Sequence, residues 1–364
     1  PLVALPMELL LNISSNLITT DLGSFRRSCK TIELSLRQDF ALEFFTKKQF
    51  MLTYPSLKAL NDIAEHPYFS KILKNVVIGL DRYKNRISRD IAGSSADEND
   101  KSYRFYKGRE EQFFLIYSGG ARNLLAKAFR NLPALQTVGL RDVNSRGRNR
   151  DGHNMPWHSY GAPTIVQETG HQMVMNSTFM NSQAEYPSLA FQILFHALGD
   201  AGAKPEIVEV FLRMSMAGLN ADGFSMPPHL RPAMEPVLAG LKTVLLAVDG
   251  AFLNTHDSDG LHIFQQSRSD KFKRFLQACP NLTHLRLNFQ NKSGIDAFLE
   301  WFVGCSGWEL ASKSPCQSQH VLPPEFPHLK TLDFGLADIT PVIILLALKR
   351  YPTITSMSFW KVIL

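Results

Sequence analysis

Cysteine is scarce in this chain of 364 residues, which contains only Cys29, Cys279, Cys305 and Cys316. Four cysteines this far apart do not form the disulfide framework that holds small secreted proteins together. Cys305 and Cys316 bracket a Ser- and Gly-containing stretch, but no CxxC pair or paired histidines accompany them as a zinc site would require. The sequence therefore favours free thiols in a reducing compartment, the cytoplasm, the nucleus or both.

Long hydrophobic runs are also missing. No run reaches the roughly 18 apolar residues that span a bilayer, and the longest candidate, residues 339–348, is interrupted by Thr340 and Pro341. No signal-peptide pattern opens the chain. We therefore expect no membrane partner. With 45% hydrophobic and 20% charged residues, the composition is that of a globular protein with a substantial core.

Recognisable catalytic motifs are absent from the sequence. It has no Gly-rich phosphate loop, no G-x-S-x-G and no H-E-x-x-H. Gly119 and Gly120 interrupt a helical pattern and predict a helix break. His153 and His158 have a spacing that a metal ion can use, but no carboxylates or cysteines are clustered beside them. Cys29 lies among apolar positions, as a buried structural thiol does. We expect no cofactor, no metal and no enzyme activity, although a triad built from distant residues would leave no local motif.

Positive charge is concentrated in the first 150 residues. They contain 24 Lys and Arg against 15 Asp and Glu, whereas the remainder contains 15 against 18. The densest cluster consists of Arg141, Arg146, Arg148 and Arg150, in a stretch rich in Asn and Gly. Such a patch suits an acidic partner. No nucleic-acid motif accompanies it, so a solvated basic loop is the simpler interpretation and nucleic acid is not predicted as a partner.

The first fifty residues carry three apolar helical patterns. Leu5, Leu9, Ile13 and Leu17 recur every four residues and form one stripe of a helix, with Pro6 suited to its first turn. A second helix, capped by Thr20 or Asp21, carries the apolar residues Leu22, Phe25 and Cys29. A third helix is expected over residues 31–51, with Ile32, Leu36, Phe40, Phe44 and Phe45 on its apolar side.

This segment resembles an F-box. The matching residues are Leu5-Pro6-Met7-Glu8-Leu9-Leu10, Ile13, Leu17, Asp21-Leu22, Phe25-Arg26 and Cys29-Lys30. Ile32-Glu33-Leu34 departs from the pattern, because many F-boxes have a Trp there. Segments further along, including a linker helix at residues 55–66, His66-Pro67-Tyr68-Phe69-Ser70 and Trp157-x-Ser159-Tyr160-Gly161, look like those of fungal F-box proteins.

The resemblance implies a partner and a mechanism. F-boxes dock onto the Skp-type adaptor of SCF (Skp–cullin–F-box) ubiquitin ligases, and through it onto a cullin. The chain would then be a non-catalytic, substrate-recruiting subunit that holds an unknown protein substrate. The residues expected in the adaptor groove are Leu5, Pro6, Leu9, Ile13, Leu17 and Leu22. Two other interpretations remain open: a scaffold that binds the adaptor without directing ubiquitination, and an α/β enzyme whose N-terminal helices only cap the domain.

The rest of the chain repeats a short pattern with apolar residues at positions i, i+3 and i+5. The copies are Leu73/Val76/Ile78, Leu135/Val138/Leu140, Ile207/Val210/Leu212, Leu241/Val244/Leu246, Leu282/Leu285/Leu287, Leu329/Leu332/Phe334 and Ile354/Met357/Phe359. In four of them a proline stands two residues before the first apolar position: Pro133, Pro280, Pro327 and Pro352. The last two positions of each copy share one face of a short strand, and helical patterns precede most copies. This is the logic of a leucine-rich repeat.

The predicted fold class is therefore α/β. A three-helix F-box over residues 1–51 is followed, over residues 52–364, by an irregular leucine-rich-repeat-like α/β solenoid that binds the substrate. Long loops are expected at residues 84–102, 144–186 and 306–324. The residues suggested for substrate binding follow the second predicted strand and combine Arg with aromatics, which are favoured in interfaces: Arg141, Arg146, Arg148, Arg150, Trp157 and Tyr160.

Overall fold

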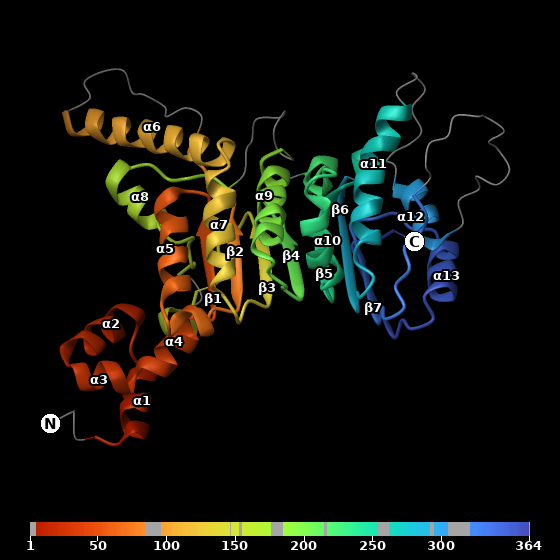
Figure 1. Ribbon diagram of the computed structural model, residues 1–364. Helices are drawn as coiled ribbons and strands as arrows, with labels where there is room; N and C mark the ends of the chain where they lie inside the picture. The colour runs from red at the N-terminus through yellow and green to blue at the C-terminus, as the bar shows by residue number, and fades with distance from the viewer. Residues whose placement is uncertain are drawn as a thin grey trace, which may run out of the picture.

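The fold was analysed in a computed structural model of the chain. The structure describes residues 5–84, 96–145, 147–152, 155–175, 185–214, 217–253, 262–291, 295–304 and 321–363. Within these residues the chain is an α/β protein built on a single open sheet of eight parallel strands (Figure 1). The predicted α/β class is thus confirmed.

The strands lie side by side in the order in which they occur in the sequence. They are β1 (Lys47–Met51), β2 (Asn75–Gly79), β3 (Thr137–Arg141), β4 (Ile207–Phe211), β5 (Thr243–Asp249), β6 (His284–Asn291), β7 (Thr331–Gly335) and β8 (Ser356–Trp360). Every neighbouring pair is parallel. Parallel neighbours require a crossover, and helices provide most of these connections.

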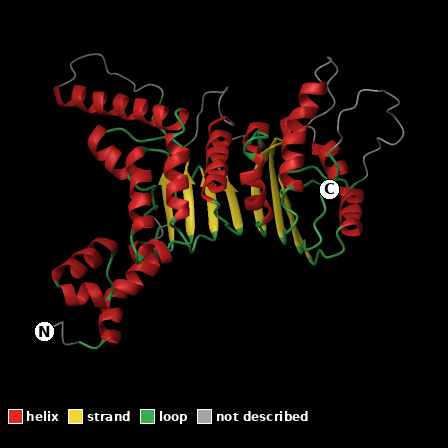
Figure 2. Ribbon diagram, in the orientation of Figure 1, coloured by secondary structure: helices red, strands yellow, loops and turns green. Residues whose placement is uncertain are grey.

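Thirteen α-helices are found among the described residues. They are α1 (Met7–Ser15), α2 (Thr19–Ser28), α3 (Lys30–Ser35), α4 (Arg37–Phe45), α5 (Tyr54–Glu65), α6 (Ala96–Tyr117), α7 (Gly120–Arg130), α8 (Ala162–Thr169), α9 (Glu185–Ala201), α10 (Arg231–Ala239), α11 (His262–Gln277), α12 (Ile295–Val303) and α13 (Pro341–Arg350). The helices that connect the strands lie along one face of the sheet (Figure 2). Among the described helices, none is both long and apolar enough to cross a membrane.

Strand register explains the repeated apolar pattern. The i+3 position is occupied in successive strands by Val76, Val138, Val208, Val244, Leu285, Leu332 and Met357, which are aligned in register. All of these except Met357, in the terminal strand, are buried. Because alternate residues of a strand point to the same face, this row and the i+5 row pack against the helices.

Two of the strand predictions need correction. In β4, Val208 and Val210 are in register with Val138 and Leu140 of β3. The copy predicted at Ile207/Val210/Leu212 therefore begins two residues too far along the sequence. Buried Pro205 occupies its first position. The strand β1 was missed entirely and assigned to the end of a helix. Its i+3 position, in register with Val76, is Lys48, which breaks the apolar pattern.

Phenylalanine fills much of the space between sheet and helices. Phe191 and Phe195 on α9 have ring centroids 4.6 Å apart, and Phe224 and Phe272 are separated by the same distance. All four are at most 1% exposed. Truncating one such ring to alanine typically costs about 3–5 kcal/mol, because a cavity remains. These rings therefore fix helices α9 and α11 against the sheet.

The N-terminal helices α1 to α4 form a small unit beyond the edge of the sheet (Figure 1). Its core consists of Leu10, Leu22, Ile32, Leu36 and Phe44. The helix expected over residues 31–51 is instead two helices, α3 and α4, followed by β1. Helix α5 corresponds to the linker helix predicted at residues 55–66.

The predicted helix break and the predicted loops have different outcomes. Gly119 has a φ of 81° and separates α6 from α7, so the predicted break is confirmed. A left-handed backbone at this point suits glycine, which has no Cβ. The prediction of a loop at residues 144–186 is wrong for α8, which lies within that range. The prediction of a loop at residues 84–102 is wrong from residue 96 onward, where α6 begins. Most of the loop expected at residues 306–324 lies outside the described residues.

Candidate functional site

The segment after β3 ties the N-terminal helices to the sheet. The guanidinium of Arg150 donates to the carbonyl oxygen of Ser14 (2.9 Å) in the last turn of α1 and to that of Leu17 (2.7 Å), just beyond the helix. It also forms an ion pair with Glu43 on α4. The last carbonyls of a helix have no partner within the helix and carry partial negative charge, so a cation stabilises them. Arg150, 10% exposed, is thus occupied inside the molecule.

Asp151 makes the matching contact with α2. Its carboxylate accepts hydrogen bonds from the backbone N–H (2.8 Å) and the hydroxyl (2.6 Å) of Thr19, the first residue of that helix. The residue that precedes the helix, Ile18, has no side chain able to cap it. Partial desolvation acts to raise the pKa of Asp151, but the hydrogen bonds from Thr19 and the nearby arginines lower it overall.

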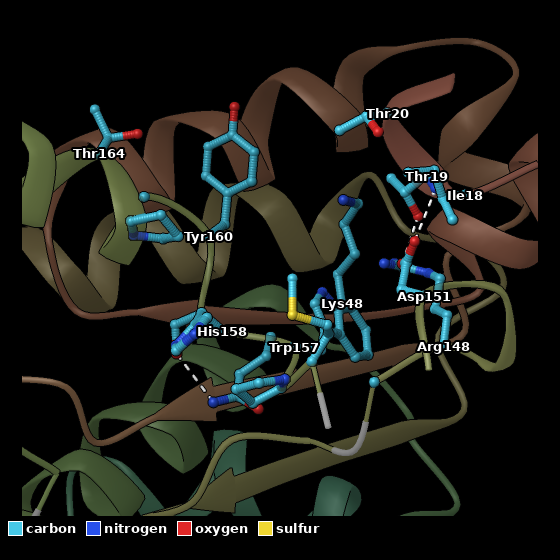
Figure 3. A pocket seen from close by; sticks show the side chains of 17 residues that line it. Ile18, Thr19, Thr20, Lys48, Arg148, Asp151, Trp157, His158, Tyr160 and Thr164 are labelled. Atoms are coloured by element: carbon cyan, nitrogen blue, oxygen red, sulfur yellow. Dashed lines mark hydrogen bonds between the residues drawn. The ribbon is translucent and has the colours of Figure 1, made fainter. Parts of the chain in front are cut away.

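An open cavity of about 600 Å³ lies at this junction, beside the edge strand β1 (Figure 3). Three segments line it: the start of α2, strand β1, and the described residues among 147–151 and 155–164. The lining residues are Ile18, Thr19, Thr20, Lys48, Gln49, Gly147, Arg148, Asp151, Met155, Pro156, Trp157, His158, Ser159, Tyr160, Gly161, Pro163 and Thr164.

Two cations border this cavity. The ammonium of Lys48 lies 4.6 Å from the ring centroid of Phe45 and 5.7 Å from that of Tyr160. The guanidinium carbon of Arg148 lies 4.2 Å from the ring centroid of Phe44 and 5.0 Å from that of Trp157. Burial, with a smaller contribution from the positive charge of Arg148, lowers the pKa of Lys48 to about 8. Burial also lowers the pKa of Arg148.

A buried polar cluster fixes one wall of the cavity. The hydroxyl of Ser159 donates to the carboxylate of Asp81 and accepts from the side-chain amide of Gln49 at 3.0 Å. The backbone N–H of Tyr160 donates to the carbonyl of Gln49 at 2.8 Å. Burial raises the pKa of Asp81. A side chain at Gly79 would collide with Ser159, Asp81 and Gln49, so this cluster requires glycine on β2.

The sheet face opposite the helices, called the open face below, carries polar side chains. Arg141 pairs with Glu209 on the neighbouring strand at 2.9 Å. Further along, Asp333 pairs with His284 (2.8 Å) and Arg286 (2.9 Å). These residues alternate with the buried apolar ones along each strand, so the open face carries one charged group at β3 and β4 and another at β6 and β7.

The structure brings together only part of the suggested substrate-binding set. Arg148, Trp157 and Tyr160 line the cavity. Arg141 lies on the open face, Arg150 holds the N-terminal helices, and Arg146 lies outside the described residues. Lys48 was not predicted from the sequence as a residue of the site. The signal that marks it is a charged residue at the apolar i+3 position, and this is recognisable only once the strand register is known.

The residues suggested for adaptor binding divide into buried and exposed groups. Leu22 is in the core of the N-terminal unit, and Leu5 and Leu17 pack against that core. Leu9 is 48% exposed and Ile13 37% exposed, and Pro6 is also exposed.

Metal-ligating groups are not gathered in the part of the chain that the structure describes, where no three His, Cys, Asp or Glu side chains converge. His158 lines the cavity, and His153 lies outside the described residues. Cys29 is partly buried at the start of α3 and Cys279 is fully buried.

No protein-family model matches the sequence, and no curated protein matches it. A parallel α/β sheet occurs in enzymes and in binding proteins alike, so the fold by itself assigns neither role. A function for this chain has to be inferred from its own residues and their geometry.

Proposed function

We propose that the chain is a substrate-recruiting, non-catalytic subunit of an SCF-type ubiquitin ligase, with an F-box in its N-terminal helices. The observation that carries this proposal is the exposed apolar surface of α1. The buried residues of this helix are Leu10 and Ser14, while Leu9 and Ile13 face outward. The sequence resemblance to an F-box covers the same helix.

The N-terminal unit carries further exposed apolar residues on α1 and outside it. Met7 and Ile18 are also exposed large apolar residues, and Leu34 and Leu42 add to them on α3 and α4. Single exposed apolar residues are common, but a group on one small unit marks an interaction surface. A partner that covered this surface would be held mainly by apolar burial, as the hook of an F-box is held by its adaptor. Leu9 and Ile13 are the residues proposed at its centre.

The sheet would serve as the substrate-binding part. Eight parallel strands in sequential order, with connecting helices on one face, support a leucine-rich-repeat-like solenoid for residues 52–364. In such a solenoid the strand face is free to bind a partner. The open face here offers partly exposed charged residues, among them Arg141, Glu209 and Arg286.

The mechanism would be one of proximity. The adaptor and cullin would bring the ubiquitin-conjugating enzyme, and this chain would raise the effective concentration of the bound substrate beside it. The chain's own side chains would then perform no covalent step. A scaffold protein would also bind the adaptor, but its adaptor complex would not recruit the cullin.

Co-expression with the Skp-type adaptor, followed by affinity capture and size-exclusion chromatography, tests the proposal. A one-to-one complex is expected for the wild type and is expected to be lost in the Leu9→Asp/Ile13→Asp double variant. Leu345→Asp is a matched control, because Leu345 is 66% exposed on α13 at the far end of the sheet. A wild-type chain that stays soluble without binding the adaptor would contradict the proposal.

Addition of the cullin to the captured complex separates the two F-box interpretations. Recruitment of the cullin, followed by ubiquitination of a bound protein, supports the ligase subunit. An adaptor complex that excludes the cullin supports the scaffold instead. A double variant that binds as well as the wild type would mean that α1 is not the contact surface.

A further inference from the structure

The cavity beside β1 is bordered by two cations, Lys48 and Arg148, that no carboxylate of the described residues contacts directly. Neither Lys48 nor Arg148 forms a hydrogen bond or an ion pair with any residue that the structure describes. Glu43 and Asp151 are the acidic residues whose negative charge acts on Arg148. Glu43 is bound by Arg150, and both carboxylate oxygens of Asp151 accept hydrogen bonds from Thr19. The two cations therefore remain available to an anion that enters the cavity.

Flat rings stand next to these cations. The ring of Tyr160, 48% exposed, rises beside Lys48 in Figure 3, and Trp157 lies below them. The guanidinium of Arg148 is close to the rings of both Trp157 and Phe44. Tyr and Trp rings provide surfaces on which planar groups stack. One wall of the cavity is thus suited to a planar ring and the adjoining wall to a negative charge.

The remaining lining is polar and the volume is moderate. Thr20 and Thr164 are exposed at the mouth of the cavity, where their hydroxyl groups can exchange hydrogen bonds with a ligand. A volume of about 600 Å³ lies within the range of small-molecule sites. It favours a small molecule over an extended polymer chain.

We propose that this cavity binds a small molecule in which a phosphate monoester is joined to a planar ring system, the chemistry of a nucleoside monophosphate. The phosphate lies between Lys48 and Arg148, since a doubly charged anion matches two cations. The ring stacks on Tyr160 or Trp157. The hydroxyl groups of Thr20 and Thr164 bind the part of the ligand that joins the ring to the phosphate. The lining of this site does not include Leu9 or Ile13 of α1, but it includes Ile18 of the apolar surface described above.

The position of the cavity gives binding a mechanical consequence. Its walls come from α2 in the N-terminal unit, from β1 in the sheet and from the segment that clamps the two together. A ligand that contacts all three walls stabilises their present arrangement, because it binds only when they are assembled. It would therefore hold the N-terminal helices in a fixed orientation relative to the sheet.

Isothermal titration calorimetry on the purified full chain tests the site with three probes: AMP, adenosine and inorganic phosphate. AMP is expected to bind at least about tenfold more tightly than either of the others, because only AMP carries both groups. Adenosine binding as well as AMP would overturn the role of the cations. Phosphate binding as well as AMP would overturn the role of the rings. Absence of AMP binding at millimolar concentration would overturn the site itself.

Variants locate the binding. Lys48→Met and Tyr160→Ala are each expected to weaken AMP binding at least about tenfold, whereas Lys48→Arg keeps the charge and retains most of the affinity. Lys71→Met is the matched control, since Lys71 is exposed and lies outside the cavity. Equal weakening by Lys71→Met and Lys48→Met would mean that AMP responds only to net charge, and would refute the assignment.

Discussion

The carboxylate of Asp151 accepts two hydrogen bonds from Thr19, a residue 132 positions earlier in the chain. It thereby caps helix α2 from a distant segment. The neighbouring Arg150 binds the end of α1 in the same way. Two consecutive residues thus hold two consecutive helices, and the orientation of the N-terminal unit depends on the segment that follows β3.

Replacing Asp151 by alanine is expected to lower the free energy of unfolding by about 1–2 kcal/mol, the usual effect of losing a helix N-cap. Urea denaturation at neutral pH measures the difference. Asp62→Ala is the control, because Asp62 forms only an exposed ion pair with Lys58, and such pairs contribute little. If the two variants lose the same stability, Asp151 is not the cap that fixes this junction.

The contribution of Asp151 also has a defined pH dependence. Its pKa in the folded protein is lower than the ordinary value of 3.8. The stabilisation is therefore fully present above that ordinary value and is lost as the pH falls through the folded-state pKa. We expect the stability gap between the wild type and Asp151→Ala to be constant from pH 7 to about pH 5 and to narrow below about pH 4. A gap that is the same at pH 3 and pH 7 would contradict this assignment.

Gly79 and Gly23 provide an opposed pair of substitutions. Gly79→Ala places a methyl group against Ser159, Asp81 and Gln49, and is expected to destabilise the protein by about 2 kcal/mol or more. Gly23 lies inside α2 with no atom within 4 Å of an added Cβ, so Gly23→Ala is expected to stabilise the protein by up to about 1 kcal/mol. Thermal unfolding of both variants checks the opposite signs.

Lys48→Met is expected to raise stability at pH 7 by about 1 kcal/mol, since the fold holds this charge partly away from water and solvent screens the remainder. The folded-state pKa of about 8 lies below the ordinary 10.5. The unfolded chain therefore binds more protons between these values, and the stability of the wild type rises with pH across that range. The advantage of the variant should shrink accordingly. Lys71→Met, at an exposed position, should change stability by less than about 0.5 kcal/mol.

Binding of AMP is expected to weaken as the pH rises from 7 to 9. Lys48 loses its proton over this range, because its pKa is about 8, while Arg148 stays charged and the phosphate stays doubly ionised. Calorimetric titrations at several pH values measure the affinity. In Lys48→Arg the affinity should remain nearly constant, and a wild-type affinity that is equally constant would argue against a role for the Lys48 ammonium.

Local patterns in the sequence predicted the sheet well but not completely. Val138 and Leu140 alternate as buried strand residues do, and a similar alternation marked most of the other strands, because burial on one face requires it. β1 was missed because Lys48 occupies an apolar position of the pattern. The short helix α8 was missed because it follows a stretch rich in Asn and Gly, where local signals favour a loop.

The sequence by itself determined most of the helices and strands, β1 and α8 excepted, since hydrophobic periodicity acts over a few residues. The tertiary structure alone decided which apolar residues of α1 are core and which are surface: Leu10 is 4% exposed and its neighbour Leu9 48%. It also decided that Lys48, Arg148 and Tyr160 line one cavity. Lys48 lies far from Arg148 and Tyr160 in the chain and meets them only because the segment after β3 packs against β1, and no local pattern encodes such a contact.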